Sequence, residues 1–470
     1  MSRTRRILAS VLIALGLLGA SAGPALAHAT LLSSTPASNS RGVLESAAAV
    51  TLRFSEPVQI LNKSDITIVN GRGSRVDTGA PQAVPGDPRR VVIPMRGPLV
   101  PMSYTVRFRI VGADSHATAQ AFVFGVGKAH LAAPILAGTG GLSDGSPTAV
   151  AARFAELVAL GLLVGLLGFR ALVWGPAVET AEGIGADERE GALRHGQRLF
   201  WRAFWALAVL AGAAESTVLA AKSAVVFHTG LLNAALHPSG PYRLVAASRF
   251  GDMLGWRSGA IAALVLVAFL AWTAESAGPP TARGARGVLA VMALLGVGAL
   301  TLLATQGHAS QAPLAPLSIL ADATHLTAAA VWIGGLPCLL AVLLRAPRAL
   351  PEGGRALASA TLRRFSKIAL WSVAVISVTG LARMAGELSS LTQLYSTGYG
   401  RDLMLKASLL LPILLLARRN RRLVAALADG LTPTAARLKA VARSVQMELA
   451  IAMGIIAVAA VLVAQIPGRA

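Results

Sequence analysis

Two patterns of apolar residues divide this chain. Between about residue 50 and residue 126, apolar and polar residues alternate over short stretches that turn residues separate. Alternation of this kind is typical of β-strands with one buried face, and several short strands in a row predict a small all-β antiparallel sandwich. We expect strands at 50–54, 65–69, 90–94, 104–110 and 121–126.

Continuous apolar runs replace the alternation from residue 151 onward. Each run is about twenty residues long, the length that an α-helix needs to cross a bilayer. They predict an all-α polytopic membrane bundle of about eight helices over residues 151–466. We place them at 151–174, 199–221, 256–274, 286–305, 317–344, 364–385, 403–417 and 447–466. Residues 131–150 are rich in Gly, Ser and Thr and are interpreted as a flexible linker after a domain at 28–130.

Residues 1–27 have the pattern of a secretory signal peptide. Arginines at positions 3, 5 and 6 precede the apolar stretch 7–20, and Ala25-Leu26-Ala27 is an A-x-A cleavage site. Cleavage after Ala27 would give the exported domain a free α-amino group on His28.

Charge supports the same topology. The chain is 54% hydrophobic and 14% charged, too apolar for an ordinary soluble protein, and its net charge is +21. The basic residues gather in the first, third, fifth and seventh loops between the apolar runs, and the 306–314 loop has none. By the positive-inside rule the odd loops are cytoplasmic. We therefore expect a multi-pass plasma-membrane protein with its sandwich and its C-terminus extracytoplasmic, and no nucleic-acid partner.

Three residues of the sandwich segment suggest a metal site. A terminal histidine chelates through its amine and its ring, and Asp114 and His116 point to one side of an extended segment because they are two apart. Together, His28, Asp114 and His116 supply the nitrogen and oxygen donors that suit Cu(II). Alternatively, His28 merely follows the cleavage site and the Asp-x-His loop is a solvated turn. The single cysteine, Cys338, excludes an internal disulfide.

The sandwich segment resembles the CopC family of copper-binding proteins. The resemblance is carried by His28-Ala29-Thr30-Leu31, by Ser34-Thr35-Pro36-Ala37, and by the strand–Asp-x-His–strand segment Tyr104–Val126. It implies a cupredoxin-like Greek-key sandwich in which His28, Asp114 and His116 bind Cu(II).

Five ionisable residues fall in the outer half of the predicted membrane bundle: Glu156, Glu215, His308, Asp322 and His325. Such groups are costly at membrane depth and commonly mark a pathway or a cofactor. Asp322 and His325 share one helical face because they are three residues apart. The alternative is that these two side chains bond each other and only hold the bundle together.

Residues 150–466 resemble the CopD family, the membrane partner of CopC. The matching segments are Gly307-His308-Ala309-Ser310, Asp322-Ala323-Thr324-His325 and Trp332-Ile333-Gly334-Gly335-Leu336. The resemblance implies inward copper movement, with His308, Asp322 and His325 as metal contacts and Glu156 and Glu215 as further candidates. The whole chain therefore resembles a CopC–CopD fusion.

We predict a copper-homeostasis protein, not an enzyme, that captures Cu(II) outside the cell and imports copper across the plasma membrane. Its partners would be copper ions, the lipid bilayer and an extracytoplasmic copper donor or reductase, with Cu(I) as the form expected in the membrane domain. Two alternatives stay open. Copper could be sequestered outside without transport, or His308 and His325 could ligate a haem in a membrane redox protein.

Overall fold

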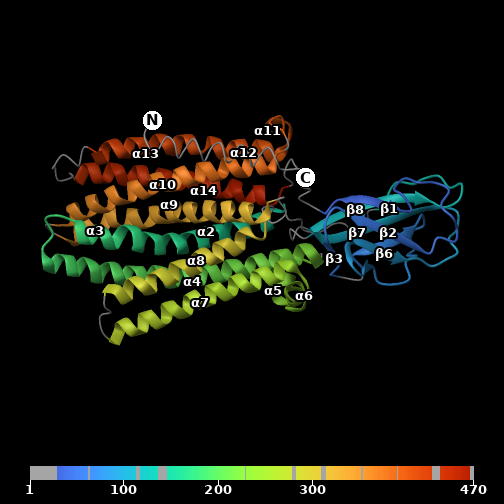
Figure 1. Ribbon diagram of the computed structural model, residues 1–470, viewed down its shortest axis with the longest axis horizontal. Helices are drawn as coiled ribbons and strands as arrows, with labels where there is room; N and C mark the ends of the chain where they lie inside the picture. Colours follow the sequence, from blue (N-terminus) through green and yellow to red (C-terminus); the bar gives the residue numbers. More distant parts are fainter. Residues whose placement is uncertain are drawn as a thin grey trace.

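The computed structural model describes residues 29–61, 64–112, 117–135, 145–227, 229–277, 282–307, 314–350, 353–388, 390–425 and 435–465. A β-domain lies at one end of a long helical bundle whose helices run along the longest axis of the molecule (Figure 1). We call the bundle end beside the β-domain the sandwich end, and the opposite end the far end. The predicted signal peptide lies outside the described residues.

The β-domain consists of two antiparallel sheets. One has the order β1-β2-β6-β5; in the other, β7 pairs with β3 and β4 on one side and with β8 on the other. The strands are β1 (Leu31–Thr35), β2 (Ala49–Phe54), β3 (Val58–Gln59), β4 (Ile66–Asn70), β5 (Gln82–Val84), β6 (Asp87–Pro94), β7 (Ser103–Gly112) and β8 (Ala117–Gly125). All five strands expected from the alternation are present. The three additional strands are β1, β3 and β5.

One apolar core joins the two sheets. Alternate residues of β2, β4, β6, β7 and β8 point into it, and Phe54 of one sheet meets Phe108 of the other edge to face, with ring centroids 5.5 Å apart. Tyr104 lies in the same core, where its hydroxyl donates to the carbonyl oxygen of Val100 at 2.9 Å. Burial raises the pKa of Tyr104 above its ordinary value, so this hydroxyl stays protonated as a donor.

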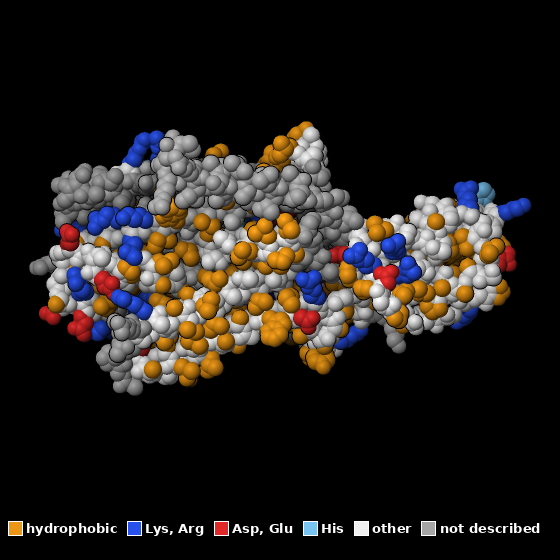
Figure 2. Space-filling model, in the orientation of Figure 1, with side chains coloured by type: hydrophobic (Ala, Val, Ile, Leu, Met, Phe, Trp, Pro, Cys, Tyr) orange, Lys and Arg blue, Asp and Glu red, His pale blue; other side chains and the backbone are white. Residues whose placement is uncertain are grey.

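The rest of the described chain is helical. Seven of its helices are long and apolar enough to cross a membrane. The elements are α2 (Pro147–Phe169), the π-helix η1 (Arg170–Trp174), α3 (Gly175–Thr180), α4 (Ala186–Phe227), α5 (Leu231–Leu236), α6 (Ser239–Ala247), α7 (Arg249–Ala277), α8 (Ala282–Ala304), α9 (Ala315–Ala349), α10 (Gly354–Glu387), α11 (Gln393–Ser396), α12 (Gly398–Ser408), α13 (Leu410–Ala425) and α14 (Ala435–Val463). Hydrophobic side chains cover much of the visible bundle surface (Figure 2), as expected for contact with lipid.

The expected helix at 403–417 is two helices rather than one. Helices α12 and α13 meet at Leu409 and follow one another along the edge of the bundle (Figure 1). The break has a local cause, because Pro412 lacks the N–H that would bond to the carbonyl of Ser408. At about 1.5 Å per residue, residues 398–425 together extend about 40 Å, enough to cross a bilayer. The seventh expected crossing is therefore a broken helix.

Helices α2 and α9 pack against each other with their backbones in contact. A Cβ atom added to Gly165 would lie 2.5 Å from the Cα of Gly334, and one added to Gly334 would lie 2.5 Å from the carbonyl oxygen of Gly161. Gly161 and Gly165 form a G-x-x-x-G pattern, which allows close approach of membrane helices. Gly161 itself has open space where its Cβ would be.

We therefore predict that Gly165→Ala destabilises the bundle, whereas Gly161→Ala does not. The added methyl group of Gly165→Ala meets backbone atoms that cannot move aside, so the cost should be about 1–3 kcal/mol. Thermal unfolding of the purified protein in detergent, followed by tryptophan fluorescence, measures the difference. Equal melting temperatures for the two variants would contradict this packing.

Candidate functional site

The predicted ligands His28, Asp114 and His116 lie outside the described residues, but the chain beside them is described. Ala29 is buried in the sandwich core. Thr30 donates its N–H to the Ser55 side chain at 3.0 Å, and Ser55 donates its own N–H to the Thr30 carbonyl at 2.9 Å. The residue that follows His28 is thus fixed beside the end of β2.

The segment with Asp114 and His116 joins β7 to β8. On either side of it, Val111 of β7 pairs with Ala117 of β8, and Gly112 pairs with Val58 of β3. Val58 is only three residues beyond Ser55, the residue that holds Thr30. The two flanks of the predicted site therefore converge at one end of the sandwich.

This end of the sandwich is docked on the bundle. The Arg109 side chain donates to the carbonyl oxygen of Val225 at 2.6 Å, and Arg243 donates to the carbonyl oxygen of Leu61 at 2.6 Å. Around these bonds, Val111 and Ala117 pack against an apolar cluster that includes Ala152, Val218, Leu244, Phe250 and Leu254. The residues next to the predicted copper ligands therefore contact the sandwich end of the membrane helices.

Glu56 is a candidate that the sequence reasoning missed. Its carboxylate follows Ser55 and is only 4% exposed, so it is a buried oxygen donor at the same end of the sandwich. In the sequence, Ser55-Glu56-Pro57 only signals the end of a strand, and burial of Glu56 could not be read from it. Among the described residues, no three His, Cys, Asp or Glu side chains are close enough to hold a metal ion.

Glu156 and Glu215 are brought together by an arginine. Arg257 of α7 is fully buried; its Nη2 lies 2.5 Å from Oε1 of Glu156, and its Nε lies 2.5 Å from Oε1 of Glu215. The remaining nitrogen, Nη1, donates to Gln306 at 2.8 Å. Arg153 provides a second cation, 2.7 Å from Oε2 of Glu156. This cluster, from α2, α4, α7 and the turn after α8, balances two carboxylates with two guanidinium groups.

His308 lies outside the described residues, two positions beyond Gln306.

Asp322 belongs to a second polar cluster, between α9, α10 and α12. Its Oδ1 lies 2.7 Å from Nη1 of Arg383, and Nη2 of the same arginine lies 3.2 Å from Glu387. The Tyr399 hydroxyl donates to the other carboxylate oxygen of Glu387. Asp322 and His325 are thus on one face of α9, but each has its partner on α10 rather than in the other.

His325 is held in a defined orientation. Thr379 donates its hydroxyl hydrogen to the carbonyl of Val375 at 2.7 Å, so its oxygen accepts from Nδ1 of His325 at 2.9 Å. The ring packs on Gly380, whose added Cβ would be 3.6 Å from Cε1. With the hydrogen on Nδ1, the Nε2 atom keeps its lone pair, which is the form of histidine that binds a metal.

The two clusters lie at the same depth. Helices α2 and α9 run in the same direction and touch where Gly165 meets Gly334. Glu156 and His325 each lie nine residues before that contact, about 14 Å toward the sandwich end. Both clusters are therefore in the half of the bundle that carries the docked sandwich.

The remaining histidines and the cysteine lie elsewhere. His130, His195 and His237 are exposed, and His228 is outside the described residues. The Sγ of Cys338 donates to the carbonyl of Gly334 at 3.7 Å, between the two largest apolar clusters.

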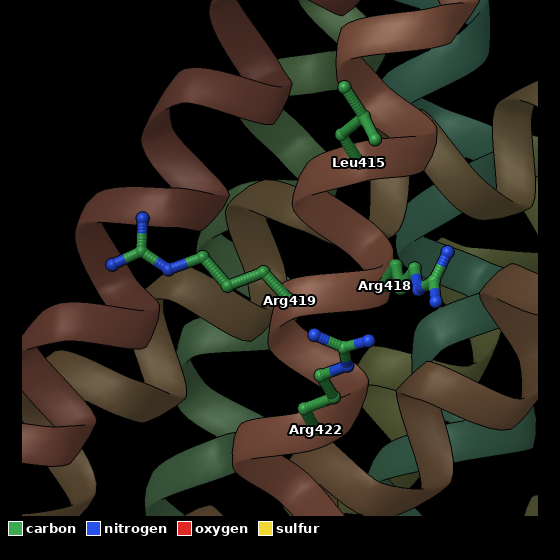
Figure 3. Close-up of a pocket in the computed structure, with 4 residues that line it drawn as sticks. All are labelled: Leu415, Arg418, Arg419 and Arg422. Atoms are coloured by element: carbon green, nitrogen blue, oxygen red, sulfur yellow. The ribbon is translucent and has the colours of Figure 1, made fainter.

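A pocket of about 380 Å³ on α13 is lined by Leu415, Arg418, Arg419 and Arg422 (Figure 3). Its guanidinium groups repel cations, so it does not suit a copper ion.

Three family models match successive parts of the chain. The CopC domain matches residues 31–127, the N-terminal domain of copper resistance protein D-like proteins matches 143–314, and copper resistance protein D matches 359–462. Together they cover both the sandwich and the bundle.

Curated relatives agree with these matches. The copper transport protein CutJ of Bacillus subtilis (strain 168) is 26% identical over 425 residues, which cover 84% of this chain and 69% of CutJ. The protein YobA of Escherichia coli (strain K12) is 31% identical over 100 residues, 21% of this chain and 79% of YobA.

Two solved structures resemble the sandwich. CopC from Methylosinus trichosporium OB3b is 25% identical, covers 23% of this chain and 99% of its own, and has a TM-score of 0.19. The copper resistance protein PcoC from Escherichia coli is 28% identical, covers 21% of this chain and 98% of its own, and has a TM-score of 0.17. Family membership follows from the sequence matches: the chain is a multi-pass membrane protein of the copper resistance and transport families, a CopC domain fused to a CopD domain.

Proposed function

We propose that this protein captures Cu(II) outside the cell with its sandwich and passes copper inward through its helical bundle. The observation that carries the proposal is the docking of the sandwich. The chain on both sides of the predicted ligands, Ala29 and Thr30 on one side and Val111 and Ala117 on the other, converges on the end that contacts the bundle. A captured ion would thus be held next to the helices.

The capturing ligands in this proposal are His28, Asp114 and His116, with the buried carboxylate of Glu56 as a neighbouring oxygen donor. Removal of residues 1–27 frees the amine of His28, which forms a chelate with its own ring. Nitrogen donors with a carboxylate favour Cu(II) over softer ions. Because the sandwich is docked, transfer to the bundle does not depend on a long excursion of the linker.

Within the bundle we assign the receiving role to His325 and Asp322, with His308 at the mouth. The Nε2 lone pair of His325 is available for copper because Thr379 occupies Nδ1. Glu156 and Glu215 have a different role in this proposal, since Arg257 and Arg153 together neutralise them and leave little negative charge for a cation. Through Arg257 they hold α2, α4 and α7 together at the depth of the path.

The distribution of positive charge supports the orientation that this proposal needs. Helices α9 and α13 both end at the far end of the bundle (Figure 1). Their last residues include five exposed arginines: Arg345, Arg348, Arg418, Arg419 and Arg422. By the positive-inside rule the far end is cytoplasmic and the sandwich extracytoplasmic. In this orientation, copper that passes from the sandwich through the bundle would move inward.

The first prediction of this proposal concerns the chelate formed by the amine and the ring of His28. His28→Ala, or one extra residue left before His28, should weaken Cu(II) binding by at least the roughly 10–100-fold that even an outer-shell change costs a metal site. Competition titration of the purified full-length protein measures the affinity. The control is His130→Ala, an exposed histidine just beyond β8. Unchanged affinity in both His28 variants would remove the terminal amine from the site.

His325 makes the second prediction. Radiocopper accumulation in a copper-limited host should require the protein and should fall to the empty-vector level in His325→Ala. Thr379→Val removes only the acceptor of Nδ1–H, so it should lower uptake by roughly 10–100-fold without removing the ligand. The control is His237→Ala, an exposed histidine between α5 and α6. Copper bound at the surface but equal intracellular copper in all cells would favour sequestration.

The third prediction concerns the Arg257 cluster. Arg257→Met leaves two buried carboxylates with Arg153 as their single described cation and should cost about 3–5 kcal/mol of stability. Adding Glu156→Gln and Glu215→Gln to the same chain removes those charges and should restore much of the lost stability. Thermal unfolding in detergent compares the single and triple variants. If the triple variant also regains copper uptake, the two glutamates are not copper ligands; a stable triple variant without uptake would return them to the path.

A further inference from the structure

A buried polar cluster between α13 and α14 has no role in the copper path. It consists of Asn420 on α13 and of Ser444 and Glu448 on α14. Their exposed fractions are 9%, 2% and 5%, so all three are more than nine-tenths buried. Glu448 lies about 20 Å along α14 from Ala435.

The contacts within this cluster are incomplete. Asn420 donates from Nδ2 to Oε1 of Glu448 at 2.7 Å. The other atom of the same amide, Oδ1, is buried without a hydrogen-bond partner among the described residues, as is Oγ of Ser444. Ser444 is one helical turn from Glu448 and lies on the same face of α14. A buried acceptor therefore remains unsatisfied beside a buried carboxyl group.

No described cation forms an ion pair with Glu448. On the helices packed around α14, Cys338 of α9 and Lys406 of α12 are half-buried. The basic residues of α9, α13 and α14 toward this cluster are exposed: Arg345, Arg348, Arg418, Arg419, Arg422 (Figure 3), Arg437, Lys439 and Arg443. On α2, the charged pair Arg153 and Glu156 lies in the opposite half of the bundle. An ionised carboxylate without a counterion is costly to bury, and the neutral acid is far less so.

We propose that Glu448 is a proton-binding site that joins α13 to α14. When the carboxyl group carries a proton, its O–H donates to Oδ1 of Asn420 while Oε1 still accepts from Nδ2. The acid and the amide then form two parallel hydrogen bonds, and the unsatisfied acceptor gains its partner. Loss of the proton removes one bond and leaves a buried charge that pushes the two helices apart.

The position of this pair gives protonation a mechanical consequence. Helix α13 is separated from α12 by the break at Leu409, so it is attached to the bundle partly through the Asn420–Glu448 bond. Proton binding would hold α13 against α14, and proton release would loosen it. If copper import is as proposed above, this is where a proton gradient would act on the transporter; the proton site itself does not depend on that function.

Infrared difference spectroscopy of the full-length protein in lipid vesicles, without copper, tests the site. Between about pH 5 and about pH 9, the wild type should show the carbonyl band of a carboxylic acid that appears on acidification and shifts in D2O. The band should be missing in Glu448→Gln. In Asn420→Leu it should persist at a higher frequency, because its hydrogen bond to Oδ1 is lost. The control is Glu179→Gln, an exposed glutamate paired with Arg286.

A band that is unchanged in Glu448→Gln, or no titrating band at all, would overturn the proposal. Displacement of the band by Na⁺ at constant pH would also overturn it in favour of a sodium site made of the same oxygens. If Glu448→Gln fails to fold, Glu448→Asp and Asn420→Leu still test the assignment through the position of the band. Copper uptake plays no part in this readout, so failure of import and failure of the proton site are separate results.

Discussion

The contact between α2 and α9 is the constraint on which the bundle depends. Gly165 and Gly334 let the two backbones meet, which only residues without a Cβ allow. Since both helices run in the same direction, this contact fixes the relative height of the groups they carry. The Arg257 cluster on one side and the Asp322–His325 cluster on the other therefore share one depth, although residues as far apart in sequence as Glu156 and Glu387 contribute to them.

The sequence was sufficient to predict the parts of the fold that depend on the alternation of apolar residues and on the length of apolar runs. Alternation predicted five strands of the sandwich, and apolar length predicted seven single helices. The broken crossing at 398–425 was predicted as one short helix, because a hydropathy pattern does not register the hydrogen bond that Pro412 removes. Short edge strands such as β3, two residues long, have too few positions for alternation to be visible.

The candidate site was predicted less completely, for a physical reason. Ionisable side chains are costly within a membrane, and this singled out Glu156, Glu215, Asp322 and His325 in the sequence. The sequence did not show which residues would be their partners. Arg257 is 101 residues from Glu156 in the sequence, and Arg383 is dozens of residues from Asp322. Only the packing of the helices brings these arginines to the carboxylates. Nothing in the sequence distinguishes Thr379 from other helix residues. Its role in orienting His325 follows only from the packing of α10 against α9.

The contact between the sandwich and the bundle has a consequence for how its residues can change in evolution. Its arginine bonds, from Arg109 to Val225 and from Arg243 to Leu61, end on main-chain carbonyl oxygens. A carbonyl oxygen is present whichever amino acid occupies the position, so substitution of Val225 or Leu61 leaves the acceptor in place. Each bond can be lost only by changing its arginine. Substitution at the acceptor position of each bond is therefore silent, and these two bonds would leave little covariation between residue pairs, in contrast to the side-chain packing of Val111 and Ala117 around them.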